Sequence, residues 1–394
     1  MSTLLIQLVV ALAKALFIIL LVLTAVPLLV WAERRVSAWM QDRHGPNRVG
    51  PAGLLQPIAD GIKFLTKEVL IPAHVDRKLY LAAPVILLVP SLMTGAIIPW
   101  SKPIPADSAL GGLVSAIDWA PNGIPFQVAQ INVGVLYFFA MASLAVYGII
   151  LAGWASNNKY TLLGGLRASA QVISYELSLG LAILSVLLIV GTLQLNTIVE
   201  WQSGGMWMVF AQPVTWFIFT IAALAETNRA PFDLAECEQE LVGGYHTEYS
   251  GMTFATFFLA EYANMTMSAA LNVCLFWGGY TFFGLEQILP WWITMGIFIG
   301  KVAAFLFLFL LIRWTFPRFR YDQLMRLGWK MLLPLALGNV VLTALGLAAH
   351  EMWAVPLWPA LIVGQVALIG GVALVSVIRT KAGSASSAQS HARA

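Results

Sequence analysis

The chain has 394 residues, of which 59% are hydrophobic and only 10% are charged. A soluble globular protein has roughly a quarter of its residues charged, so this composition excludes a water-soluble domain and indicates a chain dissolved in lipid. The formal net charge of +3 is too small to indicate nucleic-acid binding.

Nine apolar runs of about 20 residues, the length of a helix that crosses ~30 Å of hydrocarbon, predict an all-α polytopic membrane protein. The sixth run is long enough to tilt strongly or to overshoot the membrane. The first has no cleavage site of small residues and ends in Glu33-Arg34-Arg35, so we interpret it as a retained anchor rather than a signal peptide. The predicted spans are 6–31, 79–100, 128–152, 171–192, 206–226, 253–284, 291–313, 331–349 and 356–378.

The basic residues predict the orientation of these spans. Most of the 22 Lys and Arg residues fall between alternate spans, above all in segments 32–78 and 313–330, whereas Lys102 stands alone on the other side. Because positively charged loops remain on the cytoplasmic side, we expect the N-terminus outside and the C-terminus inside.

The remaining segments complete the predicted organisation. We expect one transmembrane domain over 1–380 with two inner loops, 32–78 and 227–252, and an irregular outer segment over 101–127. The small, polar residues of 381–394 predict a disordered tail.

An amphipathic surface helix is predicted within the first inner loop. Apolar residues repeat at three- and four-residue spacing from Leu54 to Leu65, while Asp60 and Lys63 occupy the opposite face. Prolines 51 and 57 mark its start.

The same loop begins with a cluster of charges around the string GPNRVGP. Its Gly and Pro density predicts a specified backbone shape, and the cluster is interpreted as a polar entrance beside the surface helix. For Arg35 and Arg43 the favoured interpretation is instead contact with lipid headgroups. The charged members are Glu33, Arg34, Arg35, Arg43 and Arg48.

Seven acidic residues lie between Glu226 and Glu261, with Arg229 as the only basic residue among them. On a helix that starts near Pro231, residues Asp233, Glu236 and Glu240 would share one face, and such neighbouring carboxyls share protons. We therefore predict a proton relay, with a solvated acidic loop as the alternative. The seven are Glu226, Asp233, Glu236, Glu238, Glu240, Glu248 and Glu261.

Two of the predicted spans carry a carboxylate. Glu176 lies about five residues into the fourth span and Glu261 about eight into the sixth, roughly 8 Å and 12 Å deep. Charges at such depth must face protein or water. Lys301, near the middle of the seventh span, is the expected counter-charge, either in a functional path or in a purely structural ion pair.

The cysteines and histidines argue against a metal site. Cys237 and Cys274 are the only cysteines, and the five histidines are scattered. Iron–sulfur clusters generally need four thiolates, and structural zinc needs four Cys or His ligands at short spacing. We expect no metal, flavin or iron–sulfur cluster on this chain, so that any electron carriers lie on partners.

Four long strings resemble one family, over about residues 15–349: the quinone-site membrane subunit of respiratory complex I, a proton-pumping NADH:quinone oxidoreductase. They are ERRVSAWMQDRHGPNRVGPAGLLQPIADGIKFLTKE, YGIILAGWASNNKYTLLGGLRASAQVISYELSLG, AETNRAPFDLAECEQELVGGYHTEYSG and TFPRFRYDQLM. The sequence departs from the family pattern at Cys237, at Lys67–Val69, and in its ninth span and tail. The extra span favours a bacterial protein in the plasma (inner) membrane.

The resemblance implies a junction between a hydrophilic redox arm and a membrane arm. Quinone, the substrate, would enter from the bilayer between the first span, the surface helix and the sixth span. Partners would be hydrophilic iron–sulfur and quinone-chamber subunits, small membrane subunits, antiporter-like subunits and membrane lipids. The residues carried over to the quinone chamber are Glu33, Arg34, Asp60, Arg229 and Phe232. Those carried over to the proton path are Glu176, Asp233, Glu236, Glu238, Glu240 and Glu248.

Three other functions are weighed against this one. The homologous subunit of an energy-converting hydrogenase would be expected to lack GPNRVGP and the complete ETNRAPFDL…GYHTEYSG string. A free-standing ion transporter would commonly show an internal repeat, and none is visible here. A passive anchor has no reason to keep Glu176, Glu261 and Lys301 inside its spans.

Overall fold

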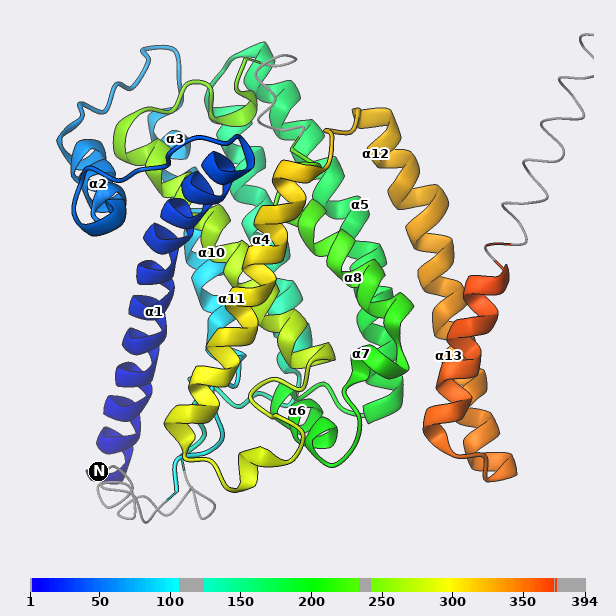
Figure 1. The fold of residues 1–394 in the computed structure, drawn as a ribbon. Helices are drawn as coiled ribbons and strands as arrows, with labels where there is room; N and C mark the ends of the chain where they lie inside the picture. Colours follow the sequence, from blue (N-terminus) through cyan, green and yellow to red (C-terminus); the bar gives the residue numbers. More distant parts are fainter. Residues whose placement is uncertain (1, 106–123, 234–241, 372, 374–394) are drawn as a thin grey trace, which may run out of the picture.

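The computed structural model describes residues 2–105, 124–233, 242–371 and 373. Within these residues the structure is helical, and the one β-pairing is an isolated bridge between Ile104 and Ile124. The long helices form a bundle in which the N-terminus lies at the end opposite to the surface helix α2 (Figure 1). The all-α prediction is confirmed for this part of the chain.

The helix labels follow Figure 1. The long helices are α1 (Ser2–Met40), α3 (Arg77–Met93), α4 (Gly134–Ala155), α5 (Lys159–Val190), α8 (Pro213–Glu226), α10 (Gly251–Phe276), α11 (Trp291–Thr315) and α13 (Leu333–Trp353). The short helices are α2 (Gln56–Thr66), α6 (Leu195–Ser203), α7 (Met208–Ala211) and α12 (Tyr321–Leu327). Short 3-10 or π segments cover Pro51–Gly53, Thr94–Ile97, Gly244–His246, Leu285–Gln287 and Gly328–Leu332, and a last apolar helix covers Leu357–Gly371.

Each of the nine predicted spans contains a helix, but six helices of the described residues are long and apolar enough to cross a membrane on their own. These are Gln7–Met40, Arg77–Ile97, Gly134–Ala155, Lys159–Val190, Trp291–Thr315 and Tyr321–Trp353. The predicted fifth span is broken into α7 and α8 at Gln212, directly before Pro213. The fourth begins at Lys159 rather than at residue 171, because Asn158 caps its first turn. The chain is a multi-pass membrane protein.

Helix α10 occupies the centre of the bundle. It packs against α1, α3, α8 and α11, and nearly every residue from Tyr262 to Phe276 is buried. A helix enclosed by protein can carry polar side chains that lipid would penalise. The prediction that this span continues to residue 284 is wrong. The helix ends at Phe276, and Gly278 and Gly279 follow with φ of 70° and 55°, which turn the chain away.

The predicted amphipathic helix is confirmed as α2. Pro57 lies in its first turn, and no residue of α2 is buried within this chain. Ile58, Ile62 and Leu65 are all more than half exposed, so its apolar stripe faces outward from the bundle. This arrangement is typical of a helix that lies on a membrane surface.

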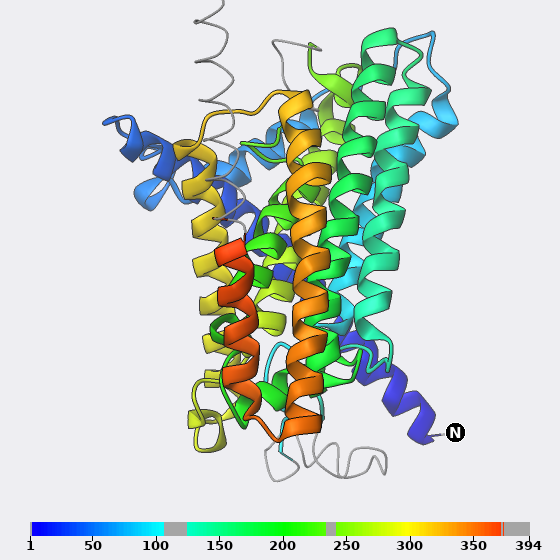
Figure 2. The ribbon, with the colours of Figure 1, turned by 90° about the vertical axis from the view of Figure 1, so that its right-hand side faces the viewer.

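The Leu357–Gly371 helix packs beside α13 at the edge of the bundle (Figure 2). Buried amides hold it there: the Gln365 Nε2 donates to Asn339 Oδ1 at 2.6 Å, and Gln365 Oε1 accepts from the Val214 amide at 3.3 Å. Asn339 Nδ2 also donates to Thr215 and Ser185 at 2.6 and 3.0 Å. Because Asn339 is fully buried, the last helix is part of the folded bundle rather than an appendage.

Replacing Asn339 with Leu should lower the stability of the protein by about 1–3 kcal/mol, because the buried Gln365 amide then loses its acceptor. The thermal denaturation midpoint of the purified protein measures this. Val341→Leu, on the half-exposed face of the same helix, is the control and should change the midpoint little. Equal midpoints for the two variants would show that the buried network does not hold the last helix.

Candidate functional site

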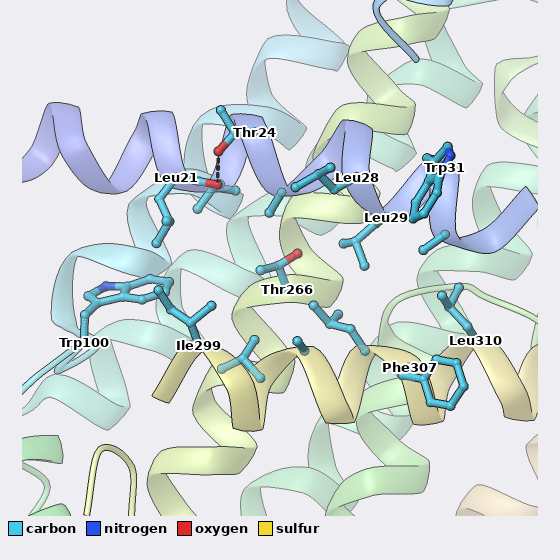
Figure 3. A pocket seen from close by; sticks show the side chains of 16 residues that line it. Leu21, Thr24, Leu28, Leu29, Trp31, Trp100, Thr266, Ile299, Phe307 and Leu310 are labelled. Atoms are coloured by element: carbon cyan, nitrogen blue, oxygen red, sulfur yellow. Dashed lines mark hydrogen bonds between the residues drawn. The ribbon is translucent and has the colours of Figure 1, made fainter. Parts of the chain in front are cut away.

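An apolar cleft of about 490 Å³ lies between α1, α10 and α11 (Figure 3). The hydroxyls of its described lining, on Thr24 and Thr266, donate to backbone carbonyls of their own helices at 2.9 and 2.8 Å, which leaves the wall apolar. Leu28 and Phe307 at its rim are about half exposed, so the cleft opens on the lipid-facing side. The cleft suits a long apolar ligand. Its walls include Leu21, Ala25, Leu29, Trp31, Trp100, Val302, Leu306 and Leu310.

A partly buried ion pair lies just beyond the residues that line one end of the cleft. Glu33 follows the wall residues Trp31 and Ala32 on α1, and Arg313 lies one helical turn beyond Leu310 on α11. The Arg313 Nη1 lies 2.5 Å from Glu33 Oε1, and the Tyr262 hydroxyl donates to Glu33 Oε2 at 2.6 Å. The described lining of the cleft is therefore apolar, and this ion pair follows it along both helices.

A second buried pair continues from the first through Tyr262. The Arg229 guanidinium lies over the Tyr262 ring at 4.2 Å and places Nη2 3.0 Å from Glu261 Oε2. The Tyr245 hydroxyl donates to Glu261 Oε1 at 2.7 Å. The Arg229 and Glu261 side chains are 4% and 7% exposed. Hydrogen bonds, one cation–π contact and an ion pair thus link Glu33 to Tyr245.

The expected pairing of Lys301 with the buried carboxylates is wrong. The Lys301 ammonium donates to the carbonyls of Trp277, Gly279 and Thr281 at 2.6–3.0 Å, at the end of α10. It therefore satisfies carbonyls at a helix end. Glu261 has Arg229 as its counter-charge instead. The sequence did not reveal these contacts of Lys301, because the apolar run that contains α10 continues beyond the end of the helix.

The string GPNRVGP has the specified backbone shape that its composition predicts. Gly50 adopts a φ of 73°, and Gly53, just after the string, adopts 74°. A Cβ atom on Gly53 would lie 2.2 Å from the Pro46 carbonyl oxygen. Arg35 fastens this turn to α1, because its Nη1 donates to the Ala52 carbonyl at 2.8 Å.

Arg34 and Asp60 join this turn region to α2. The Arg34 Nη1 lies 2.6 Å from Asp60 Oδ2, with the Arg34 side chain 46% exposed. Lys63 lies 3.8 Å from the other oxygen of Asp60. Exposed pairs of this kind contribute little free energy, so Arg34 remains available to a ligand or partner.

Glu176 lies half-buried in α5 and accepts a short hydrogen bond from the Ser143 hydroxyl of α4. Glu226 is buried at the end of α8. Both acids were visible in the sequence. Ser143 carried no sequence signal.

The other predicted acids take separate positions. Glu248 Oε1 accepts from Asn158 Nδ2 at 2.8 Å at the start of α5. Asp233 lies 3.5 Å from Arg318 and is buried. Next to Glu248, the Tyr249 hydroxyl donates to the Tyr80 carbonyl at 3.2 Å. Burial raises the pKa of Tyr249, so its phenol stays protonated. Glu236, Glu238 and Glu240, and the predicted helix face that they share with Asp233, lie outside the described residues.

Phe232 is buried by aromatic packing. Its ring stacks on Phe319 with centroids 5.6 Å apart, and Tyr175 lies 6.0 Å away. The Gln171 side chain holds the adjoining backbone by donating to the Phe232 carbonyl at 2.9 Å. Phe232 therefore helps to fix the segment that carries Arg229.

Sequence reasoning missed several residues of this site. Tyr262 lies within a long apolar run and Tyr245 within one of the strings that resemble the family, and neither was singled out. Arg313 was counted only as one of the charges that set the orientation of the spans. The signal that could have found Tyr262 is its position next to Glu261 on a span, where a polar side chain needs a partner.

Close backbone approach positions the Tyr245 segment. A Cβ atom on Gly164 of α5 would lie 2.7 Å from Gly244 Cα. Gly164→Ala should therefore displace this segment and cost about 1–3 kcal/mol. Gly180→Ala on the same helix meets no atom within 4 Å and should be neutral or slightly stabilising. Thermal denaturation of the two variants compares them, and a fully stable Gly164→Ala protein would contradict the close packing.

Comparison with known proteins places this geometry in a family. Residues 13–344 match the family model described as NADH dehydrogenase. Relatives named as NADH-quinone oxidoreductase subunits of the H type are 49% identical over 331 residues in Geobacter sulfurreducens, covering 84% of this chain and 94% of the relative, and 47% identical over 357 residues in Koribacter versatilis, covering 88% and 99%. NADH-quinone oxidoreductase subunit 8 of Rhodothermus marinus is 48% identical over 353 residues, covering 86% and 97%.

The matched range includes most of α1 and all of α10 and α11, and therefore the cleft lining and both ion pairs. It ends before the Leu357–Gly371 helix. The chain belongs to the NADH dehydrogenase family, together with relatives named as H subunits of NADH-quinone oxidoreductase.

Proposed function

We propose that this chain is the membrane subunit of a proton-translocating NADH:quinone oxidoreductase and forms part of its quinone chamber. The names of its relatives support the assignment to this enzyme. The apolar cleft, with the Glu33–Arg313 pair just beyond its lining, carries the proposal of a quinone chamber. A quinone combines a long apolar tail with a polar head, and the cleft offers both environments in that order.

In this proposal the tail lies between α1 and α11, and the head reaches toward the charged end. Residues Glu33, Arg34, Asp60, Arg229 and Phe232 belong to the walls and supports of the chamber. The exposed apolar stripe of α2 supports a position of that helix at the membrane surface, beside the end of α1 that carries Glu33. The chain binds quinone as a substrate and leaves electron transfer to carriers on other subunits.

The acidic residues would form the path that couples quinone reduction to proton movement. The positions of Glu176, half-buried in α5, and of the buried Asp233 support this, since carboxyls within or beside apolar spans are commonly functional. The proposed path comprises Glu176, Asp233, Glu236, Glu238, Glu240 and Glu248. Its inner end lies at the surface that carries α2, with the N-terminus outside and the C-terminus inside.

The proposed setting is the plasma (inner) membrane of a bacterium. The expected partners are hydrophilic iron–sulfur and quinone-chamber subunits, small membrane subunits, antiporter-like subunits and lipids. The hydrogenase and free-standing transporter alternatives have less support. The relatives that align with this chain over nearly their whole length are named as NADH-quinone oxidoreductase subunits.

Filling the cleft tests this proposal. Ala25→Trp places an indole against the cleft wall and should raise the KM for a long-tailed quinone about tenfold, equivalent to about 1.4 kcal/mol. A quinone with a short tail should be affected less. NADH oxidation with ferricyanide, which takes electrons upstream of quinone, should not change.

The control for this test is Leu12→Trp, on an exposed part of α1 that does not line the cleft. It should leave the KM for both quinones unchanged. If Ala25→Trp and Leu12→Trp have the same kinetics with the long-tailed quinone, the tail does not lie in this cleft.

A further inference from the structure

A second pocket, of about 410 Å³, lies where α3, α4 and α5 meet, away from the apolar cleft. The turn between α4 and α5 forms one wall, and the segment before α3 forms the other. Its lining is polar and basic with one exposed indole, unlike that of the cleft. The residues that define it are His74, Asp76, Trp154, Asn157, Asn158 and Lys159.

Hydrogen bonds between its two walls fix the pocket. The Asp76 amide donates to the Ala155 carbonyl at 3.1 Å, and Asn157 Nδ2 donates to the His74 carbonyl at 3.2 Å. The Asp76 carboxylate accepts from the first amides of α3, at Lys78 and Leu79. Its negative charge is therefore engaged at the start of a helix, where it is stabilised.

Basic residues lie in and beside the pocket. Lys159 lines it, and Arg77 and Lys78 follow the lining residue Asp76 as exposed residues in the first turn of α3. Each Lys or Arg near a membrane surface attracts anionic headgroups by about 1 kcal/mol. These three cations outnumber the nearby acids, Asp76 of the lining and Glu248, which accepts from the lining residue Asn158, so the local charge favours a phosphate.

An exposed apolar stripe leads from the pocket along α4. Leu144, Tyr147, Leu151 and Trp154 follow the spacing i, i+3, i+7 and i+10, so they share one face of the helix. Leu144, Tyr147 and Trp154 are 46%, 58% and 67% exposed. The stripe therefore offers a lipid-facing surface that ends at the indole beside the basic pocket, the position that Trp prefers at a membrane interface.

We propose that this pocket binds the headgroup of an anionic phospholipid whose acyl chain lies on the α4 stripe. Phosphate chemistry fits the basic opening, and the adjoining stripe requires a ligand that is apolar beyond its headgroup. The site is separate from the quinone cleft and does not depend on the proposed function. Asn158, which lines the pocket, donates to Glu248, so an occupied site would adjoin one of the acidic residues named above.

The test uses the intact complex, stripped of lipid in detergent and then incubated with a photoreactive phosphatidylglycerol. Cross-links are located by peptide mapping. Labelling is expected within residues 144–162, with Lys159→Gln weakening the apparent affinity about fivefold, the equivalent of about 1 kcal/mol. The control is Lys330→Gln, an exposed lysine in the Gly328–Leu332 segment, which should label like the wild type. Photoreactive phosphatidylcholine should label this segment weakly in all three proteins.

Two competition arms identify the ligand. Unlabelled phosphatidylglycerol should displace the label, whereas inorganic phosphate at the same concentration should not, because it has no acyl chain. Equal labelling of the Lys159→Gln and wild-type complexes, equal labelling by the zwitterionic lipid, or displacement by phosphate alone would each overturn the proposal. Trp154→Ser should weaken labelling as well, and its failure to do so would refute the proposed position of the acyl chain.

Discussion

Replacing Arg229 with Met should destabilise the protein by about 3–5 kcal/mol, because it removes the opposite charge from a buried carboxylate. The Arg229 and Glu261 side chains are 4% and 7% exposed, and their charged atoms lie 3.0 Å apart. In the variant, Glu261 keeps only the Tyr245 hydroxyl among these partners. The yield of assembled complex and its thermal inactivation midpoint measure the loss.

The double variant Arg229→Met/Glu261→Met separates the loss of an ion pair from the loss of the arginine itself. Removing both charges from a buried pair is commonly tolerated, so the double variant should recover much of the stability. Arg318→Gln is the matched control: its contact with Asp233 is 3.5 Å and the arginine is 52% exposed, so it should cost at most about 1 kcal/mol. Equal losses in Arg229→Met and Arg318→Gln would contradict the account of burial.

Replacing Glu176 with Gln should lower NADH oxidation with quinone at least about tenfold, since a positioned proton-transfer group contributes roughly a hundredfold or more. The amide keeps the size of the side chain and can still accept from Ser143, but it cannot take up a proton. NADH oxidation with ferricyanide should persist, because those electrons leave upstream of quinone. Both reactions are measured in membranes with the content of assembled complex determined in parallel.

Glu351→Gln makes the same chemical change at an exposed carboxylate near the end of α13 and should leave both reactions unchanged. Loss of both reactions in Glu176→Gln together with loss of assembly would assign Glu176 a structural role. Unchanged quinone activity in an assembled complex would remove Glu176 from the proposed path.

The sequence predicted the helical elements well wherever lipid is their solvent. Spans such as Gly134–Ala155 and Trp291–Thr315 follow directly from apolar length, because a membrane helix must be apolar whatever its neighbours are. The predicted end of α10 was wrong, because protein surrounds this helix and it ends at Phe276 rather than at residue 284. It also missed the break between α7 and α8, where Pro213 starts a new helix and Gln212 is buried among polar partners.

The candidate site was predicted only in part. Carboxylates and arginines in or beside apolar runs stand out in a sequence, and Glu33, Arg229 and Glu261 are all prominent for this reason. Their pairing could not be read from the chain, because Glu33 and Arg313 are brought together only by the packing of α1 beside α11. Tyr262 links the two ion pairs through its hydroxyl and its ring.

The sequence by itself determined that this chain is a helical multi-pass membrane protein, and its long motifs indicated the family that the comparisons establish. Composition and motif strings can be read without any knowledge of packing, since both are properties of the chain itself. Only the tertiary structure decided that Glu261 pairs with Arg229, that Lys301 binds carbonyls at the end of α10, and that an apolar cleft lies between α1, α10 and α11. The physical reason is that a buried charge is stabilised by whichever opposite charge or dipole lies within a few ångströms, and helix packing alone sets that distance.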